Sequence, residues 1–309
     1  MRIYVAGING MVGSTIALEA RAQAHEVIGK SSKELDFTNR TAVFNELQEI
    51  KPDFLIIAAA KVGGIGANSS LPVDFLSINL QIQTNLLDAA HVAKIKKVLF
   101  LGSSCIYPKL AHQPIHESSL LTGPLEPTNE QYAIAKIAGL KLVEAYRRQF
   151  GHHWINAMPS NLYGPRDNFN LETAHVLPTL IHRFHNAKVN GDSKVEVWGD
   201  GTPLREFLYV DDLAKACMML MDNYDDSMAI NIGSGHEISI GSLVTLVSKV
   251  VGFTGEIIFN TDRPNGTPRK LLDSAKIAEL GWKPLVTLED GIALTYNWFL
   301  ENHSKAKNP

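Results

Sequence analysis

Short apolar runs alternate with longer segments of helical spacing through the first half of the chain. The runs are rich in Val, Ile and Leu and end in glycine or polar residues, which is typical of strands buried in a parallel sheet. They predict strands at Arg2–Ala6, His25–Gly29, Asp53–Ala59 and Val98–Leu101. Helices are predicted between them, at Ser14–Arg21, Arg40–Ile50 and Pro72–Ala93. This alternation predicts an α/β protein with a doubly wound parallel sheet.

The second half of the chain is less regular. The pattern predicts strands at Trp154–Met158, Val195–Trp198, Arg205–Val210 and Ile230–Ile232. Helices are expected from His175 through His185, from the caps Asp211 and Asp212 to Met221, and up to Phe299, with a disordered tail from Ser304 to Pro309. We expect a larger domain of residues 1–165 and 204–235, and a smaller one of residues 166–203 and 236–309.

Composition excludes several classes of protein. The 309 residues are 45% hydrophobic and 20% charged, and a net charge of -3 argues against a general nucleic-acid binder. Two cysteines, Cys105 and Cys217, indicate a reducing compartment and no disulfide framework. The first strand leaves no room for a signal peptide, and no apolar run has transmembrane length, so we expect a cytoplasmic protein without membrane or metal partners.

A glycine-rich turn follows the first strand directly. The sequence Gly7-Ile-Asn-Gly-Met-Val-Gly13 leads into the predicted helix. Glycines at such a turn allow the pyrophosphate of a dinucleotide to approach backbone amides at a helix N-terminus. We therefore expect a Rossmann-type domain in which this turn binds a cofactor through Gly7, Asn9, Gly10, Met11, Val12 and Gly13.

The residues after the second strand bear on the choice between NAD and NADP. An NAD enzyme normally places Asp or Glu there, whereas this chain has Lys30-Ser31-Ser32-Lys33. Cations and hydroxyls suit a 2′-phosphate, so NADP(H) is favoured, with Lys30, Ser32 and Lys33 as its ligands. A solvated turn with incidental lysines is the alternative. Asp36 is a weaker candidate for contact with the adenine.

The fourth predicted strand delivers Ser103, Ser104 and Cys105 at its carboxyl end, where open α/β sheets bind ligands. Thr128 and Gln131 predict a capping box, followed by a helix that carries Tyr132 and Lys136 on one face. A phenol has a pKa near ~10, and a nearby ammonium lowers it. Ser, Tyr and Lys together predict proton transfer beside a carbonyl carbon. A surface Tyr/Lys pair is the alternative.

Some other positions have plainer interpretations. Glycines at Gly63, Gly64 and Gly66 predict a backbone that passes close to another group, expected to be the cofactor or the substrate. Asn79 and Asn85 are expected to be buried amides that brace loops. Cys217 is expected in the core, and His152 and His153 at the surface.

In this order, the glycine turn, the serine strand end and the Tyr132/Lys136 helix resemble an extended short-chain dehydrogenase/reductase over essentially the full length. Longer strings are similar to the GDP-L-fucose synthase family within that group: Ala58–Ile65, Gly102–Pro108, Glu126–Asn129, Tyr132–Gly139, Asn161–Pro165 and Gly266–Asp273. The resemblance implies 3,5-epimerisation and NADPH-dependent 4-reduction of GDP-4-keto-6-deoxy-D-mannose to GDP-L-fucose. It also implies a homodimer, with Pro72–Ala93 and Tyr132–Phe150 as candidate pairing helices.

The resemblance also implies roles for individual residues. Cys105 would be the base and His175 the acid of epimerisation. Tyr132 would protonate O4, Lys136 would lower the tyrosine pKa and hold the nicotinamide ribose, and Ser103 would bind O4. Further cofactor contacts are expected at Leu101, Gly102, Ser104, Pro159, Asn161 and Leu162. GDP-sugar contacts are expected at Arg183, Trp198, Arg205, Asn265 and Lys270.

One departure and three alternatives stay open. Asn9 and Ser32 stand where the family often has arginines, which leaves the strength of the NADPH preference open. A 4,6-dehydratase would carry an acidic pair where Ser104 and Cys105 stand. A simple 4-epimerase would be expected to show an acid near Lys30. A non-catalytic binding module commonly loses the Tyr/Lys pair that this chain keeps.

Overall fold

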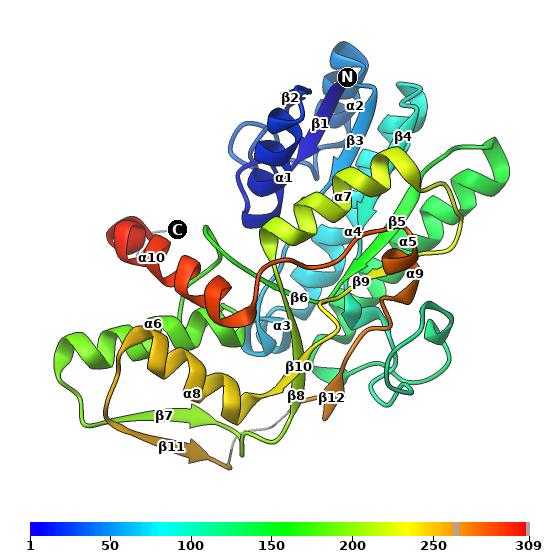
Figure 1. The fold of residues 1–309 in the computed structure, drawn as a ribbon. Coiled ribbons are helices and arrows are strands. Elements are labelled where there is room, and N and C mark those ends of the chain that lie inside the picture. Colours follow the sequence, from blue (N-terminus) through cyan, green and yellow to red (C-terminus); the bar gives the residue numbers. More distant parts are fainter. Residues whose placement is uncertain (263–265, 307–309) are drawn as a thin grey trace.

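A six-stranded parallel sheet forms the centre of the larger part of the molecule (Figure 1). The computed structural model describes residues 1–262 and 266–306. The strand order is β2-β1-β3-β4-β5-β9, with β1 (Arg2–Ala6), β2 (Glu26–Ile28), β3 (Phe54–Ile57), β4 (Lys97–Leu101), β5 (Ile155–Pro159) and β9 (Ile230–Ile232). The predicted doubly wound α/β sheet is confirmed.

Helices cover both faces of this sheet because its strands are apolar on both sides. Tyr4, Leu55 and Phe100 pack on one face, against α2 (Arg40–Ile50), α4 (Pro72–Val92) and α5 (Glu130–Phe150). Ile3 and Ile56 pack on the other, against α1 (Met11–Ala22), α7 (Val210–Asn223) and α9 (Ala275–Glu279). Cys217 lies fully buried in α7, which confirms its expected place in the core.

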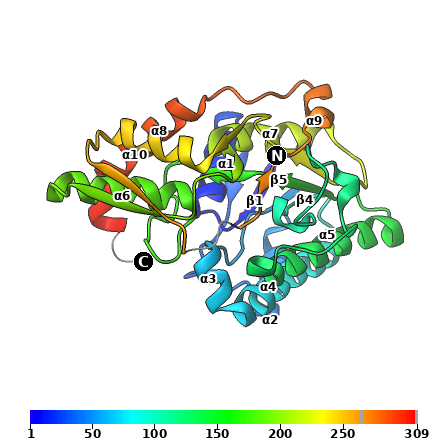
Figure 2. The ribbon, with the colours of Figure 1, turned by 90° about the horizontal axis from the view of Figure 1, so that it is seen from below.

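A second apolar core lies in the smaller part of the molecule. It joins α6 (Val176–Asn190), α8 (Ile240–Val251) and α10 (Leu288–Ala306) to the parallel strand pair β7 (Lys194–Trp198) and β11 (Glu256–Asn260). Figure 2 shows these three helices gathered on the side away from α2, α4 and α5. The two cores thus belong to different regions of the fold.

A four-stranded sheet lies between these regions. β8 (Leu204–Tyr209) pairs with β6 (Asn161–Tyr163), β10 (Glu237–Ser239) and β12 (Arg269–Lys270). The predicted strand Arg205–Val210 therefore belongs to this sheet, and not to the six-stranded one. Short helices complete the fold: α3 (Ile65–Ser70), η1 (Ser104–Ile106), η2 (Glu117–Ser119) and η3 (Pro127–Asn129).

Two predicted helix starts and the tail need correction. Thr128 lies in η3, and α5 begins at Glu130 with Asn129 at its N-cap, so the capping box is wrong. Tyr209 is the N-cap of α7, so the expected caps Asp211 and Asp212 lie in its first turn. The buried Asp212 carboxylate does not cap the helix but accepts hydrogen bonds from the amides of Leu285 and Val286. The tail predicted to be disordered from Ser304 is helical through Ala306, and residues 307–309 lie outside the described residues.

The two buried asparagines of α4 behave as predicted. Asn79 donates to the carbonyls of Lys61 and Phe75 and accepts from the Lys61 amide. Asn85 donates to the carbonyls of Phe37 and Thr38. Each amide therefore fixes a loop to the helix. Among residues 1–262 and 266–306, no helix has both the length and the apolar character needed to cross a membrane.

Candidate active site

The carboxyl end of β4 holds Ser103 and Cys105 in a fixed turn. The Gly102 amide donates to the carbonyl of Ala157 at 2.9 Å, and a Cβ on Gly102 would lie 2.3 Å from the sulfur of Met158. The Ser103 hydroxyl oxygen accepts from the Cys105 amide at 3.2 Å and so caps η1. Gly102 and the side-chain cap of Ser103 therefore fix the side chains of Ser103 and Cys105 at the carboxyl end of β4.

Lys136 lies on the inner face of α5, below this edge. Its side chain is 4% exposed, and its ammonium donates to the Leu101 carbonyl at 2.8 Å. The same nitrogen lies 5.9 Å from the ring centroid of Tyr132, one helical turn earlier. Burial lowers the pKa of Lys136 to about 8. The strand end, the lysine and the tyrosine are thus brought together as predicted.

Tyr132 departs from expectation in its protonation. Burial raises its pKa first, and the neighbouring charge of Cys105 raises it further, while a hydrogen bond from Ser103 opposes both. Its pKa is thus raised and not lowered as expected, and Lys136 is not among the causes of the shift. Tyr132 is therefore a neutral phenol, which is the form that donates a proton.

Two nitrogen donors surround the sulfur of Cys105. The side-chain amide of Asn129 lies 3.3 Å from Sγ, and the ammonium of Lys270 lies 3.6 Å from it. Lys270 was expected to bind the GDP-sugar, and the structure places it against the cysteine. Hydrogen bonds and a positive charge favour the thiolate form of a cysteine, which is the reactive form.

His175 is the N-cap residue of α6 and is exposed. The surrounding protein lowers its pKa, and the ammonium of Lys270 lowers it further. Lys270 therefore contacts Cys105 and lowers the pKa of His175. This lysine connects the two residues that the sequence analysis paired as base and acid.

The glycine loop after β3 holds the segment that carries His175. The Gly64 amide donates to the Thr173 carbonyl at 2.8 Å, and a Cβ on Gly64 would lie 2.3 Å from the Ala174 carbonyl oxygen. Asn68 in turn donates to the carbonyls of Gly63 and Gly64. The close approach observed at Gly64 is thus to the protein backbone just before His175, whereas the sequence led us to expect the cofactor or the substrate.

The glycine turn between β1 and α1 has the form that a pyrophosphate needs. Gly7 has a φ of +86°, and its carbonyl accepts from the Gly10 amide at 3.0 Å. A Cβ on Gly13 would lie 2.1 Å from the Gly7 oxygen, so only glycine fits there. Gly10 is the N-cap of α1, and the amides of Met11, Val12 and Gly13 form the anion-binding first turn.

The region expected to contact the 2′-phosphate is already partly paired. Lys30 forms an ion pair of 2.5 Å with the buried carboxylate of Glu46. Ser32 and Lys33 are exposed. Asp36 accepts from the amide and hydroxyl of Thr38, which makes it a turn residue in this structure. Lys33 is therefore the more available of the two cations.

Of the residues expected to bind the GDP-sugar, Arg183 and Trp198 lie on α6 and β7 of the smaller region, and Arg205 and Lys270 lie on β8 and β12. The Arg183 guanidinium lies 5.7 Å from the ring centroid of Trp198 and donates to the Glu196 carbonyl. Trp198 is half exposed. Burial lowers the pKa of Arg205, while the charges of Cys105 and Glu126 oppose this shift. Asn265 lies outside the described residues.

The second strand end expected to contact the cofactor follows β5. Pro159 is the last residue of β5, and Asn161 and Leu162 belong to β6. The Asn161 side chain donates to the Glu206 carbonyl at 2.7 Å. The side-chain amide of Asn161 therefore links β6 to β8.

The model of the NAD dependent epimerase/dehydratase family matches residues 3–233 of this chain. The chain belongs to this family. GDP-L-fucose synthase 1 of Arabidopsis thaliana is 55% identical over 302 residues, covering 97% of this chain and 94% of the relative. GDP-L-fucose synthase of Escherichia coli K12 is 48% identical over 98% of each chain. The structure of a GDP-L-fucose synthetase from Naegleria fowleri bound to NADP matches with a TM-score of 0.91 and 30% identity, covering 99% and 96% of the chains.

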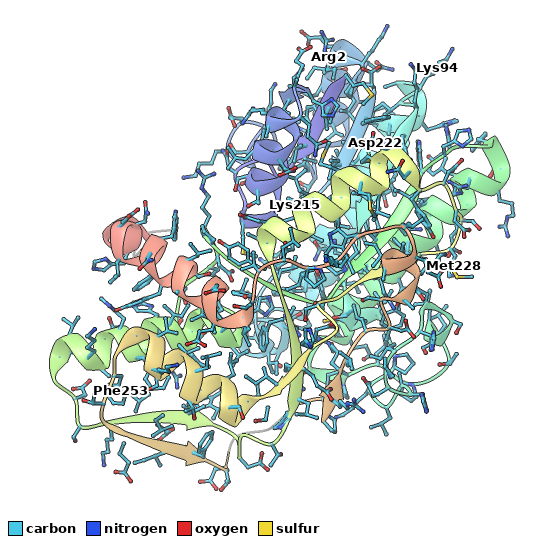
Figure 3. All side chains as sticks on the ribbon, viewed as in Figure 1. Arg2, Lys94, Lys215, Asp222, Met228 and Phe253 are labelled. Atoms are coloured by element: carbon cyan, nitrogen blue, oxygen red, sulfur yellow. The ribbon has the colours of Figure 1, made fainter. Side chains whose placement is uncertain are left out.

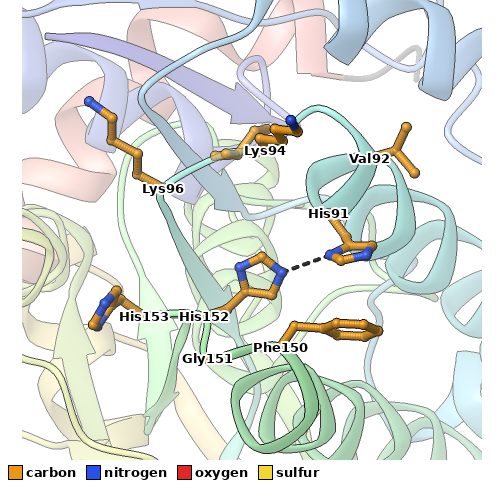
Figure 4. A pocket seen from close by; sticks show the side chains of 9 residues that line it. His91, Val92, Lys94, Lys96, Phe150, Gly151, His152 and His153 are labelled. Carbon is orange, nitrogen blue, oxygen red and sulfur yellow. Dashed lines mark hydrogen bonds between the residues drawn. The ribbon is translucent and has the colours of Figure 1, made fainter.

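A separate pocket lies at the opposite edge of the sheet, where β4 and β5 begin (Figure 4). His91 and His152 point toward each other in it, with their ring nitrogens 2.8 Å apart. His153 is exposed as expected, but His152 stacks on Trp154 and is only partly exposed, so that prediction is half right. Arg2 and Lys94, labelled in Figure 3, mark this end of the molecule.

Sequence reasoning missed two parts of the site. Asn129 stands in the string Glu126–Asn129, three residues before Tyr132, and its contact with Cys105 spans 24 positions. Gly64 was noted for close approach, but its partner Thr173 is more than one hundred residues away. The glycine was a usable signal, whereas nothing in the sequence indicated what the asparagine contacts.

Proposed function

We propose that this protein is a GDP-L-fucose synthase, which converts GDP-4-keto-6-deoxy-D-mannose to GDP-L-fucose by 3,5-epimerisation and NADPH-dependent 4-reduction. The relatives described above, matched over nearly their whole length, support this proposal. The observation that carries it is the position of Lys270. Its ammonium lies 3.6 Å from the sulfur of Cys105 and lowers the pKa of His175, which supports a site in which both residues act near Ser103.

The larger region provides the features that an NADP site needs. Residues 1–165 and 204–235 would hold the cofactor, with its pyrophosphate at the Gly7–Gly13 turn and its ribose near Lys136. The fit rests on the turn between Gly7 and Gly13, where a Cβ would fill the space. NADPH, when bound, supplies the hydride that is added to C4. Residues 166–203 and 236–309 would hold the nucleotide of the substrate.

The first reaction exchanges protons at the carbons next to the ketone. The thiolate of Cys105 takes the proton from C3 or C5, and the electron pair moves into an enolate on O4. The imidazolium of His175 then gives a proton to the same carbon from the other face. The thiol and the neutral imidazole return to their starting forms by proton exchange with solvent, so protons balance.

The second reaction reduces the ketone. Ser103 donates a hydrogen bond to O4, and the phenol of Tyr132 gives O4 its proton as the hydride adds to C4. Lys136 is positively charged below its lowered pKa and stabilises the phenolate that this step leaves. The raised pKa of Tyr132 keeps it protonated until that moment.

The GDP moiety would bind along the smaller region. Arg205 and Arg183 provide positive charge for the diphosphate, and the exposed ring of Trp198 provides a face for stacking. The contact between Arg183 and Trp198 supports this placement, because it holds the two side chains together. Asn265 stays a candidate from the sequence alone.

The biological unit would be a homodimer formed through α4 and α5. These two helices pack against each other and leave Val73 74% exposed and Ile134 42% exposed on their outer face. Two such pairs would bury these side chains in a four-helix interface. Light scattering coupled to size exclusion would give a dimer mass, and Ile134→Glu would give a monomer.

The direct test is conversion of the substrate in deuterated water with NADPH. The proposal predicts NADPH oxidation and GDP-L-fucose that carries deuterium at C3 and C5 by NMR. NADPH oxidation with an unepimerised deoxy sugar would show a simple reductase and remove the roles given to Cys105 and His175. No turnover with NADPH or NADH would contradict the proposal and favour another sugar nucleotide.

A further inference from the structure

We propose that Asn129 is a positioning residue that orients the sulfur of Cys105 for proton abstraction. This inference deepens the proposed function, because it rests on Cys105 acting as the base. The Asn129 amide nitrogen lies 3.3 Å from the cysteine sulfur. An N–H that donates to sulfur favours the charged form over the neutral thiol.

The position of Asn129 at a helix start makes this contact unusual. An N-cap asparagine normally accepts a hydrogen bond from an amide in the first helical turn. Asn39 does so at the start of α2, where its side-chain oxygen accepts from the Ala42 amide at 3.1 Å. Asn129 occupies the same position on α5 and makes no such bond. Its side chain is directed to the cysteine and leaves the helix uncapped.

The side-chain oxygen of Asn129 also bears on how the amide is oriented. Its oxygen is buried and has no hydrogen-bond partner among the described residues. Leaving a buried acceptor without a partner costs free energy. The contact of the amide nitrogen with the cysteine sulfur is the interaction that this orientation gains in return.

Asn129 differs in kind from the second donor, Lys270. The lysine comes from β12, in the region proposed to bind the GDP-sugar, whereas Asn129 is fixed between η3 and α5, beside Tyr132. The Cys105 amide donates to Ser103 on the other side. One of the two donors to the sulfur therefore comes from the N-cap of the helix that carries Tyr132 and Lys136.

The test measures the reactivity of Cys105 without any substrate. Iodoacetamide reacts with thiolates, and Cys217 is fully buried, so alkylation of the folded protein reports on Cys105. Asn129→Ala should slow alkylation at neutral pH roughly tenfold and move its pH profile upward by about one unit. Asn129→Asp, which keeps the shape and adds a negative charge, should slow it further.

The matched control is Asn39→Ala. This variant removes a true cap, so its melting temperature should fall while its alkylation profile stays unchanged. Asn129→Ala should show the reverse, with a slower proton exchange at C3 and C5 and an unchanged KM. An unchanged alkylation profile in both Asn129 variants would overturn the inference. If the profile moves but the wild-type protein does not turn over the keto sugar, the proposed function fails and the positioning role stands.

Discussion

The two sets of reactive residues are held in different ways. Ser103, Tyr132 and Lys136 come from one strand end and the helix that follows, and the lysine is buried against the backbone of β4. Cys105 shares that strand end and is contacted by Asn129 at the start of α5, but its other donor, Lys270 of β12, and the glycine loop that holds the segment before His175 come from far away in the sequence. The reduction residues are thus a local unit, and the epimerisation residues depend on tertiary contacts.

This difference gives each set its own sensitivity. A change within the local unit should affect hydride addition alone. A change at a remote contact should move Cys105 or His175 and affect proton exchange first. The two reactions should therefore be separable by substitution.

Tyr132→Phe should have the largest effect, because it removes the proton donor of reduction while keeping the ring. NADPH oxidation should fall about a hundredfold to ten-thousandfold. Tyr146→Phe, on the same helix but hydrogen-bonded to Asp88, is the control and should leave the rate unchanged. An equal loss of NADPH oxidation in both variants would show that the substitutions disturb the structure of α5 and would not support a specific role of Tyr132.

Cys105→Ser should slow deuterium incorporation at C3 and C5 about a hundredfold, since a hydroxyl is a much weaker base than a thiolate. NADPH oxidation should continue and give an unepimerised deoxy sugar, as product NMR would show. Cys217→Ala is the control, because that residue lies in the core away from the site. Loss of both reactions in Cys105→Ser would argue against separate residue sets.

Gly64→Ala should slow epimerisation roughly tenfold with a smaller effect on reduction. The added methyl would lie 2.3 Å from the Ala174 oxygen and displace the segment before His175. Gly66→Ala is the matched control, since its nearest contact is 3.5 Å. Deuterium exchange rates of the two variants give the answer, and equal rates would remove the role of the glycine loop.

The pH dependence of reduction should follow Lys136. Its ammonium is present below a pKa of about 8 and is lost above it, so kcat/KM for NADPH should fall as pH rises through about 8, by up to tenfold per unit. Lys136→Arg should remove this alkaline limb, because arginine stays charged. A flat wild-type profile up to pH 10 would contradict the assigned role.

Most of the fold and the local unit could be predicted from the sequence. Strand and helix alternation indicated the central sheet, and the spacing of Tyr132 and Lys136 placed them on one helix face. The partner of β8 could not be predicted, because Arg205–Val210 has the pattern of any buried strand. Nor could the contact of Asp212 with the chain before α10, since a carboxylate after a strand suggests a cap.

The site was predictable to the extent that its chemistry is local. Lys270 carries a charge that suits a diphosphate, and nothing in its sequence neighbourhood places it against Cys105. Lys30 suits a 2′-phosphate, but Glu46 on α2 already pairs with it. Both lysines contact a partner on another element of the fold. Such contacts depend on how helices and strands pack, and they leave no periodic pattern in the sequence.

The cofactor preference should show the smallest effect. Lys33→Ala should reduce the preference for NADPH over NADH by a few-fold, since an exposed charge interacts weakly with a phosphate. Lys30→Ala should change it less, because Glu46 already neutralises that lysine. Ratios of kcat/KM for the two cofactors would measure this, and a larger effect at Lys30 would reverse the assignment.

The most direct test of the separation is deuterium exchange by Tyr132→Phe without NADPH. The variant would be mixed with GDP-4-keto-6-deoxy-D-mannose in deuterated water, and exchange at C3 and C5 followed by NMR. We predict exchange at close to the wild-type rate, because Cys105 and His175 are intact. Loss of exchange in this variant would show that Tyr132 also acts in epimerisation, and would contradict the division into separate reduction and epimerisation residues.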